Sequence, residues 1–133
     1  MAAMNMQTAY KQNAMKTASP AELTLMLYNG CLKFMKQAKQ AIEEKNVEHR
    51  NLYTNKAQDI IRELMVTLKT DSEVGKNMLR LYDFALDRLI EANVKSDLKA
   101  LEDAEDIMVQ FRDTWKEAMQ LDRQQRHGAG GQA

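Results

Sequence analysis

Residues that break helices are almost missing from the interior of this chain. Its 133 residues include one proline and five glycines, and three of those glycines lie within the last six positions. Leucine, alanine, lysine, glutamate, glutamine and methionine, which favour helices, are abundant in the remainder. We therefore expect long helices, interrupted only where short polar clusters supply capping groups.

These polar clusters divide the chain into four predicted helices. Ser19 and Glu22 form a capping box, and Pro20 stands at the first helical residue, where its missing N–H costs little. The predicted helices span Pro20–Glu44, Val47–Lys69, Glu73–Val94 and Leu98–Arg126. Because the breaks are only two or three residues long, successive helices must run antiparallel. The expected fold is all-α, an elongated up-down-up-down four-helix bundle.

The bundle is expected to occupy residues 19–127, between two less ordered segments. Residues 1–18 are polar with recurring apolar side chains, and they are predicted to form a flexible, mobile arm. This arm is either a disordered tail or a segment that docks on an apolar surface through Met6, Tyr10 and Met15. Gly128 is predicted to cap the last helix, and the glycine-rich residues 128–133 are expected to be disordered.

The predicted helix Pro20–Glu44 has apolar side chains on more of its circumference than one buried stripe requires. At about 100° per residue, the core stripe is centred on Leu27 and includes Leu23, Cys31, Phe34, Ala38 and Ala41. A second strip, nearly opposite, contains Leu25 and Leu32, with Tyr28 and Met35 on the shoulder between. Either another segment of the chain covers this strip or a partner helix binds to it.

Phe84 is a further apolar residue on a polar helix face. It falls on the opposite side of its helix from the predicted stripe, beside Arg80 and Asp87. Single exposed aromatic residues are common and need no explanation. Phe84 is therefore either one of these or part of a contact surface.

The composition excludes several classes of protein. Nineteen Lys and Arg residues balance nineteen Asp and Glu residues, which argues against nucleic-acid binding through a basic field. No apolar run approaches the roughly 20 residues that cross a bilayer, and the amino end lacks the pattern of a signal peptide, so we expect no membrane insertion. The single cysteine excludes an internal disulfide and suits a reducing compartment, so a cytoplasmic location is expected.

No catalytic, metal or cofactor site is predicted. Bundles with two metal ions use inward carboxylates and Glu-x-x-His pairs, but neither His49 nor His127 has a glutamate three residues before it. Cys31 falls on the predicted core stripe without a nearby histidine, so it is predicted to be a packed side chain rather than a nucleophile. Phosphate-binding loops and nucleophile elbows are also missing. The residues indicate a non-enzymatic helical binding module.

Four stretches, in order and at characteristic spacing, carry a more specific signal: Thr8-Ala9-Tyr10 with Asn13, Ser19 to Phe34, Leu89 to Asn93, and Phe111 to Trp115. In these stretches, and over essentially its whole length, the chain resembles the FliS family of flagellin-specific export chaperones of the bacterial flagellum. The resemblance implies a cytoplasmic helical bundle that binds the carboxyl-terminal segment of flagellin and prevents premature polymerisation. It also implies delivery of flagellin to the export gate of the flagellar type III apparatus. No cofactor is expected, and the sequence leaves open whether other flagellar regulators bind as well.

The resemblance also implies that the amino-terminal arm lies over part of the flagellin site as a removable lid. Such a lid lowers the apparent affinity by the fraction of time that the site is open. The residues predicted to form the flagellin groove or the lid are Met6, Tyr10, Leu25, Tyr28, Leu32, Met35 and Phe84. The competing hypothesis is a structural or adaptor bundle that self-associates through the Leu25–Tyr28–Leu32 strip and Phe84. The sequence leaves open which helix pair forms the groove and whether the arm competes or contributes.

Overall fold

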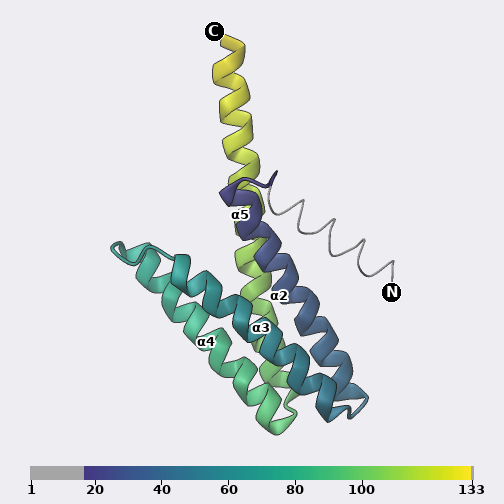
Figure 1. Cartoon of the computed structure of the whole chain (residues 1–133). Helices are drawn as coiled ribbons and strands as arrows, with labels where there is room; N and C mark the ends of the chain where they lie inside the picture. The colour runs from purple at the N-terminus through teal and green to yellow at the C-terminus, as the bar shows by residue number, and fades with distance from the viewer. Residues whose placement is uncertain (1–16, 133) are drawn as a thin grey trace, which may run out of the picture.

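The computed structural model describes residues 17–132, with side chains described for residues 17–126. Within this range the chain forms four helices: α2 (Pro20–Glu43), α3 (Val47–Thr67), α4 (Glu73–Lys95) and α5 (Leu98–Gln132). Each helix packs against the next one along the chain, and α5 packs back against α2. The predicted antiparallel four-helix bundle is thus confirmed (Figure 1). Most of the predicted arm, with Met6, Tyr10 and Met15, lies outside the described residues.

Capping side chains explain why the helices begin where they do. In each case a side-chain oxygen accepts a hydrogen bond from the backbone amide three residues later, at 3.0–3.2 Å. The capping residues are Ser19, Asn46, Ser72 and Asp97. A cap of this kind stabilises a helix by about 1 kcal/mol. All four predicted helix starts agree with the structure.

The carboxyl end of α5 differs from the prediction. The helix continues through Gly128 to Gln132, so the predicted cap at Gly128 was wrong. None of the described glycines adopts the left-handed backbone that such a cap requires. A glycine inside a helix costs about 1 kcal/mol relative to alanine, which weakens the helix without ending it. In Figure 1 this end of α5 projects well beyond the other three helices.

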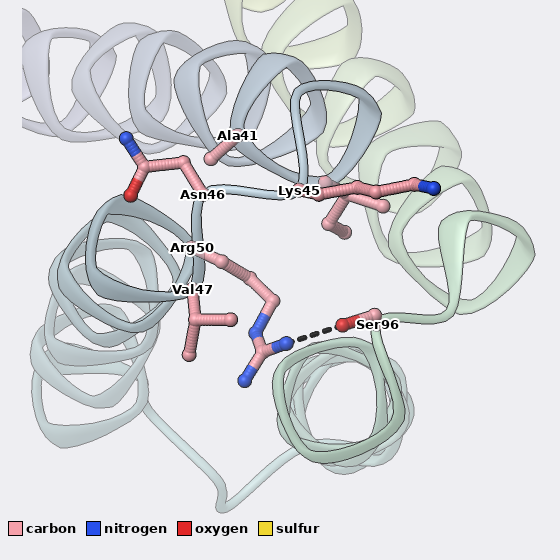
Figure 2. Close-up of a pocket in the computed structure, with 7 residues that line it drawn as sticks. Ala41, Lys45, Asn46, Val47, Arg50 and Ser96 are labelled. Atoms are coloured by element: carbon pink, nitrogen blue, oxygen red, sulfur yellow. Dashed lines mark hydrogen bonds between the residues drawn. The ribbon is translucent and has the colours of Figure 1, made fainter.

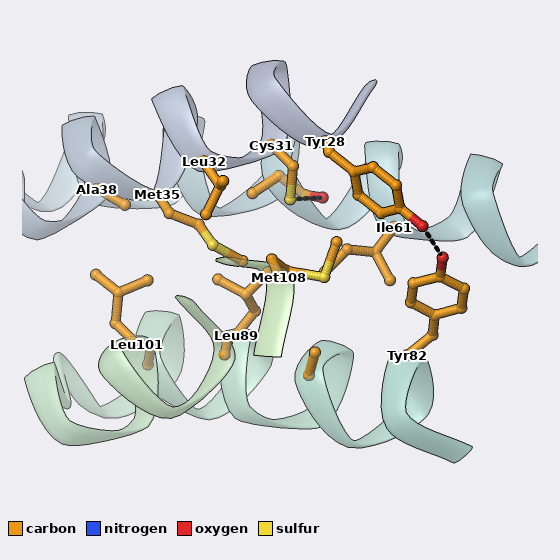
Figure 3. Packing of buried hydrophobic residues seen from close by; sticks show 14 of the residues in the cluster. Tyr28, Cys31, Leu32, Met35, Ala38, Ile61, Tyr82, Leu89, Leu101 and Met108 are labelled. Carbon is orange, nitrogen blue, oxygen red and sulfur yellow. Dashed lines mark hydrogen bonds between the residues drawn. The ribbon is translucent and has the colours of Figure 1, made fainter. Parts of the chain in front are cut away.

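One continuous apolar core runs through the bundle, with buried side chains from all four helices. The largest fully buried apolar side chains are Tyr28, Met35, Ile61, Tyr82, Leu89, Leu101 and Met108 (Figure 3). Burying one side chain of this size contributes about 1.5–3 kcal/mol to the free energy of unfolding. The core therefore provides the rigid support on which any surface site depends.

The rotation of α2 differs from the prediction. Tyr28, Leu32 and Met35, predicted to lie on or beside an outward strip, are at most 6% exposed and belong to the core. The cause is that α2 packs against both α3 and α5, so its buried sector is wide and centred between them. Leu27, the predicted centre of the stripe, is only partly buried. Of the predicted strip, Leu25 alone keeps partial exposure.

Candidate functional site

An apolar groove with a volume of about 380 Å³ lies between the first half of α4 and the middle of α5. The α4 wall is formed by Val74, Met78 and Leu81, and the α5 wall by Ile107, Phe111, Thr114, Trp115 and Ala118. On the α4 wall, Val74 is 69% exposed and Leu81 is 46% exposed. Large apolar side chains gathered in one concave, accessible place are typical of binding sites.

Aromatic rings form the floor of this groove. The ring of Phe111 lies 4.7 Å from that of Tyr82 and 6.2 Å, in parallel orientation, from that of Tyr28, between centroids. Trp115 meets Tyr28 edge-on at 6.5 Å. Aromatic pairs at these separations attract one another by about 0.5–1.5 kcal/mol beyond their burial. Because the rings come from α2, α4 and α5, they hold the floor together from three sides.

A hydrogen bond between two buried hydroxyl groups joins the floor residue Tyr28 to Tyr82, which packs behind the floor. The Tyr28 and Tyr82 oxygens lie 2.6 Å apart (Figure 3), so each buried hydroxyl has a partner. Burial raises the pKa of both tyrosines above the usual 10.0, because the charged phenolate is poorly solvated there. The floor is therefore uncharged at neutral pH and suits an apolar ligand surface.

Trp115 connects the groove to the start of α2. Its indole Nε1–H donates a hydrogen bond of 2.9 Å to the Ala21 carbonyl oxygen in the first turn of that helix. The bond satisfies the polar end of the indole and leaves the ring on the groove wall. As a consequence, the first turn of α2 lies beside the groove.

Charged side chains cross between α4 and α5 nearer their connecting turn. Arg88 pairs with Asp103 at 3.2 Å and also with Glu91 on its own helix. Lys99 bonds Asp103 at 3.1 Å, and this hydrogen bond lowers the pKa of the Asp103 carboxyl. The apolar part of the α4–α5 surface is therefore bounded at this end by ion pairs.

A second cavity, of about 270 Å³, lies at the end of the bundle where the α2–α3 and α4–α5 turns meet. Figure 2 shows Arg50 extending across it toward Ser96, to which it donates a hydrogen bond. The Arg50 Nε donates a second bond of 3.2 Å to Asn93. Because these donors join α3 to α4, this cavity is part of the support of the bundle and is a weaker candidate for a ligand.

Metal ligands, membrane-spanning helices and the single cysteine can each be checked among the described residues. They contain no group of side chains that could hold a metal ion, and no helix among them has the length and apolarity to cross a membrane. Cys31 is buried, and burial raises the pKa of its thiol to about 12. A thiol that stays protonated at neutral pH is not an activated nucleophile.

The sequence of this chain is similar to those of known proteins over most of its length. A family model described as flagellar protein FliS matches residues 2–122. The chain belongs to the FliS family. The flagellar secretion chaperone FliS of Bacillus subtilis (strain 168) is 50% identical over 131 residues, which cover 98% of both chains. The protein of the same name from Escherichia coli (strain K12) is 32% identical and covers 81% of this chain and 82% of its own.

A solved structure supports the fold independently of close sequence identity. A crystal structure of a flagellar chaperone from bacteria aligns with a TM-score of 0.70, over 88% of this chain and 97% of its own, at 18% identity. The FliS resemblance of the sequence is thus confirmed, and so is the prediction of an export chaperone rather than an enzyme, since FliS is a family of chaperones.

The predicted site residues of this FliS chain lie in different places. Tyr28 contributes to the groove floor, although it is only 2% exposed. Leu32 and Met35 lie in the core, and Leu25 does not line the groove. Phe84 is 51% exposed and follows Leu81 by three residues on α4, which places it at the outer edge of the groove. Met6 and Tyr10 lie outside the described residues.

The two walls of the groove were missed in this FliS chain, although the sequence contains a signal for each. Leu81 and Ile107 both lie beside the fully buried faces of their helices. A lateral apolar residue indicates either a wider core face or a rim of a binding surface. Only the pairing of α4 with α5 shows that these two lateral positions belong to the same groove.

Proposed function

We propose that this chain is a cytoplasmic export chaperone that binds the carboxyl-terminal segment of flagellin in the groove between α4 and α5. Binding would cover apolar flagellin surface that otherwise leads to premature polymerisation, until flagellin reaches the flagellar export gate. Membership of the FliS family supports the chaperone role. The observation that carries the choice of site is the exposed apolar wall of Val74 and Leu81 above an aromatic floor.

The groove fits an amphipathic helix laid along it. Such a ligand places apolar side chains at i, i+3 or i+4, and i+7 into a groove between two helices. The α5 wall repeats at the same spacing, through Ile107, Phe111, Thr114 and Ala118. A segment that is disordered when free must order on binding, and this entropy cost reduces the net affinity. Moderate affinity suits a chaperone that releases its cargo without nucleotide hydrolysis.

Residues 1–18 are proposed to act as the lid of this groove through Met6 and Tyr10. Support comes from the hydrogen bond between Trp115 and Ala21, because it places the start of α2 beside the groove. The arm therefore begins within reach of the site. An arm that occupies the groove in the absence of flagellin would protect the exposed apolar wall from nonspecific contacts.

Most of the surface that the competing hypothesis of self-association requires is buried inside the bundle. It depended on an exposed strip of Leu25, Tyr28 and Leu32, and two of these three residues are buried in the core. Phe84 remains exposed, but it adjoins the proposed groove. Other flagellar regulators stay proposed partners, with no surface assigned to them.

Isothermal titration calorimetry with a peptide of the flagellin carboxyl-terminal segment tests this function. We expect one peptide to bind per chain at low-micromolar concentration or tighter, with a gain of helical circular dichroism when the two are mixed. In a sedimentation assay, the chain should also reduce the amount of polymerised flagellin. Failure of the peptide to bind at micromolar concentrations would reject the proposal.

A further inference from the structure

The solvent edge of the α5 groove wall carries a row of carboxylates. Asp106, Asp113 and Glu117 each precede a residue of the groove lining by one position. At about 100° per residue, this offset places all three on the outer side of the apolar wall. They are separated by seven and four positions, so they share one face of α5. All three are exposed.

Two of these carboxylates form no ion pair within 4.0 Å among the described residues. Asp113 accepts a hydrogen bond of 3.0 Å from Arg112, whereas Asp106 and Glu117 form no ion pair with any side chain that the structure describes. The whole chain has zero formal net charge. The negative potential at this edge is therefore local and does not reflect a generally acidic protein.

The opposite edge of the groove, on α4, exposes apolar side chains. On α4 the corresponding face contains Leu81 and, three residues on, Phe84, both of which are exposed. Next on this face is Arg88, whose charge is already paired with Asp103 and Glu91. The α4 edge of the groove therefore carries exposed apolar side chains beside Arg80 and Asp87, which have opposite charges, whereas the α5 edge is acidic.

We propose that the groove selects an amphipathic helix with lysine or arginine side chains along the flank that lies beside α5, and apolar side chains along the flank beside α4. This inference rests on the proposed use of the groove and adds the charge of the bound helix. Lysine and arginine suit such a flank, because their apolar stems cover the groove wall while their charged ends reach the solvent edge. A helix with an acidic flank would meet like charges and be disfavoured.

The geometry also sets the length of the contact. From Ile107 to Ala118 the α5 wall extends about 17 Å, at 1.5 Å per residue, which corresponds to three helical turns. Asp106 and Glu117 lie at the two ends of this wall. The basic residues of the ligand should therefore repeat along one flank over about three turns, in register with the carboxylates.

The test compares two synthetic amphipathic peptides of about 18 residues with the same leucine stripe. One carries lysine on both flanks of the stripe and the other carries glutamate on both, so that the direction of binding does not affect the comparison. Each is titrated by calorimetry into the full wild-type chain, into Asp106→Lys/Glu117→Lys, and into the control Glu43→Lys/Glu63→Lys. The control residues are exposed on α2 and α3 and form no described ion pair, so both variants change the net charge equally.

We expect the wild-type chain and the control variant to bind the lysine peptide about tenfold more tightly than the glutamate peptide at low ionic strength. The preference should fall below about threefold at roughly 0.5 M salt, and the Asp106→Lys/Glu117→Lys variant should lose or reverse it. Equal affinities for the two peptides in the wild-type chain, no binding of either, or equal responses of both variants would overturn the inference. If the Asp106→Lys/Glu117→Lys variant does not fold, the wild-type comparison alone decides.

A parallel titration with the flagellin carboxyl-terminal peptide separates this inference from the proposed function. A flagellin peptide that binds the wild-type chain and both variants equally would leave the function intact and overturn the acidic-edge inference. A flagellin peptide that fails to bind, together with a clear lysine preference in the synthetic pair, would reject flagellin as the ligand and retain the inference.

Discussion

The hydroxyl oxygens of Tyr28 and Tyr82 lie 2.6 Å apart beneath the proposed groove. This hydrogen bond joins α2 to α4, two helices that lie diagonally across the bundle. The two side chains are 2% and 1% exposed. Each hydroxyl is thus the polar partner that allows the other to be buried. The stability of the bundle and the shape of the groove floor depend on the same pair.

Removing one hydroxyl of this pair should be worse than removing both. Tyr82→Phe leaves the Tyr28 hydroxyl buried without its partner, which should lower the free energy of unfolding by about 1–3 kcal/mol. The double variant Tyr28→Phe/Tyr82→Phe should recover part of that loss, because no polar group is then left unsatisfied. Urea denaturation of the single and double variants measures both quantities. Losses that simply add would show that the hydrogen bond is not energetically coupled.

Alkaline pH should destabilise the bundle. Burial raises the pKa of Cys31 from the usual 9.0 to about 12, and it raises the pKa of Tyr28 and Tyr82 as well. The unfolded chain therefore loses these protons first. The stability that the groups contribute is fully present below about pH 9 and is lost as the pH rises toward their folded pKa values. Cys31 alone lowers the free energy of unfolding by about 1.4 kcal/mol per pH unit in that window.

Urea midpoints measured from about pH 8 to about pH 11 test this dependence. The comparison variant is Cys31→Ala, which removes the thiol and its contact of 3.7 Å with the Ala57 carbonyl oxygen. Its stability should decline less steeply with pH than that of the wild-type chain. Parallel declines would mean that the thiol does not contribute.

Gly30 in α2 and Gly75 in α4 should respond oppositely to alanine. A Cβ at Gly75 would lie 1.9 Å from the Lys69 carbonyl oxygen, so the α3–α4 turn would have to move. At Gly30 the nearest side-chain atom, from Ile60, would be 3.4 Å away, which is an ordinary contact. Gly75→Ala should therefore cost about 1–3 kcal/mol, whereas Gly30→Ala should stabilise α2 by up to about 1 kcal/mol. Thermal melts that rank the two variants the other way would contradict this account.

Deleting residues 1–17 should tighten the binding of flagellin peptide. If the arm competes for the groove, the apparent affinity of the intact chain is reduced by the fraction of chains in which the groove is open. Removing the arm restores the intrinsic affinity, which calorimetry measures directly. Weaker binding by the shortened chain would show instead that the arm forms part of the site.

The helix starts could be predicted because their signals are local. Ser19, Asn46, Ser72 and Asp97 act on amides three residues away, and nothing distant in the chain alters that geometry. The short breaks then determined the antiparallel order of the helices. The predicted end of α5 was wrong because a glycine permits a left-handed cap without requiring one.

The rotation of α2 and the location of the groove could not be predicted from local sequence signals. Leu32 looked outward because the prediction assigned α2 a single buried stripe, whereas contact with both α3 and α5 buries a wider sector. Leu81 and Ile107 lie on different helices, and their relation depends on the way α4 and α5 pack together. Sequence periodicity defines faces of single helices, and a groove is a property of two.

A comparison of two exposed apolar positions tests most directly whether the α4–α5 groove binds flagellin. Leu81→Asp places a charge on the groove wall, and Val66→Asp makes the same kind of change on α3, where the valine is 81% exposed and does not line the groove. Neither variant should lose much stability, since both side chains are exposed. In calorimetry with the flagellin carboxyl-terminal peptide, we predict that Leu81→Asp binds roughly tenfold or more weakly than wild type, while Val66→Asp binds normally. Unchanged binding by a folded Leu81→Asp variant would contradict the assignment of the site.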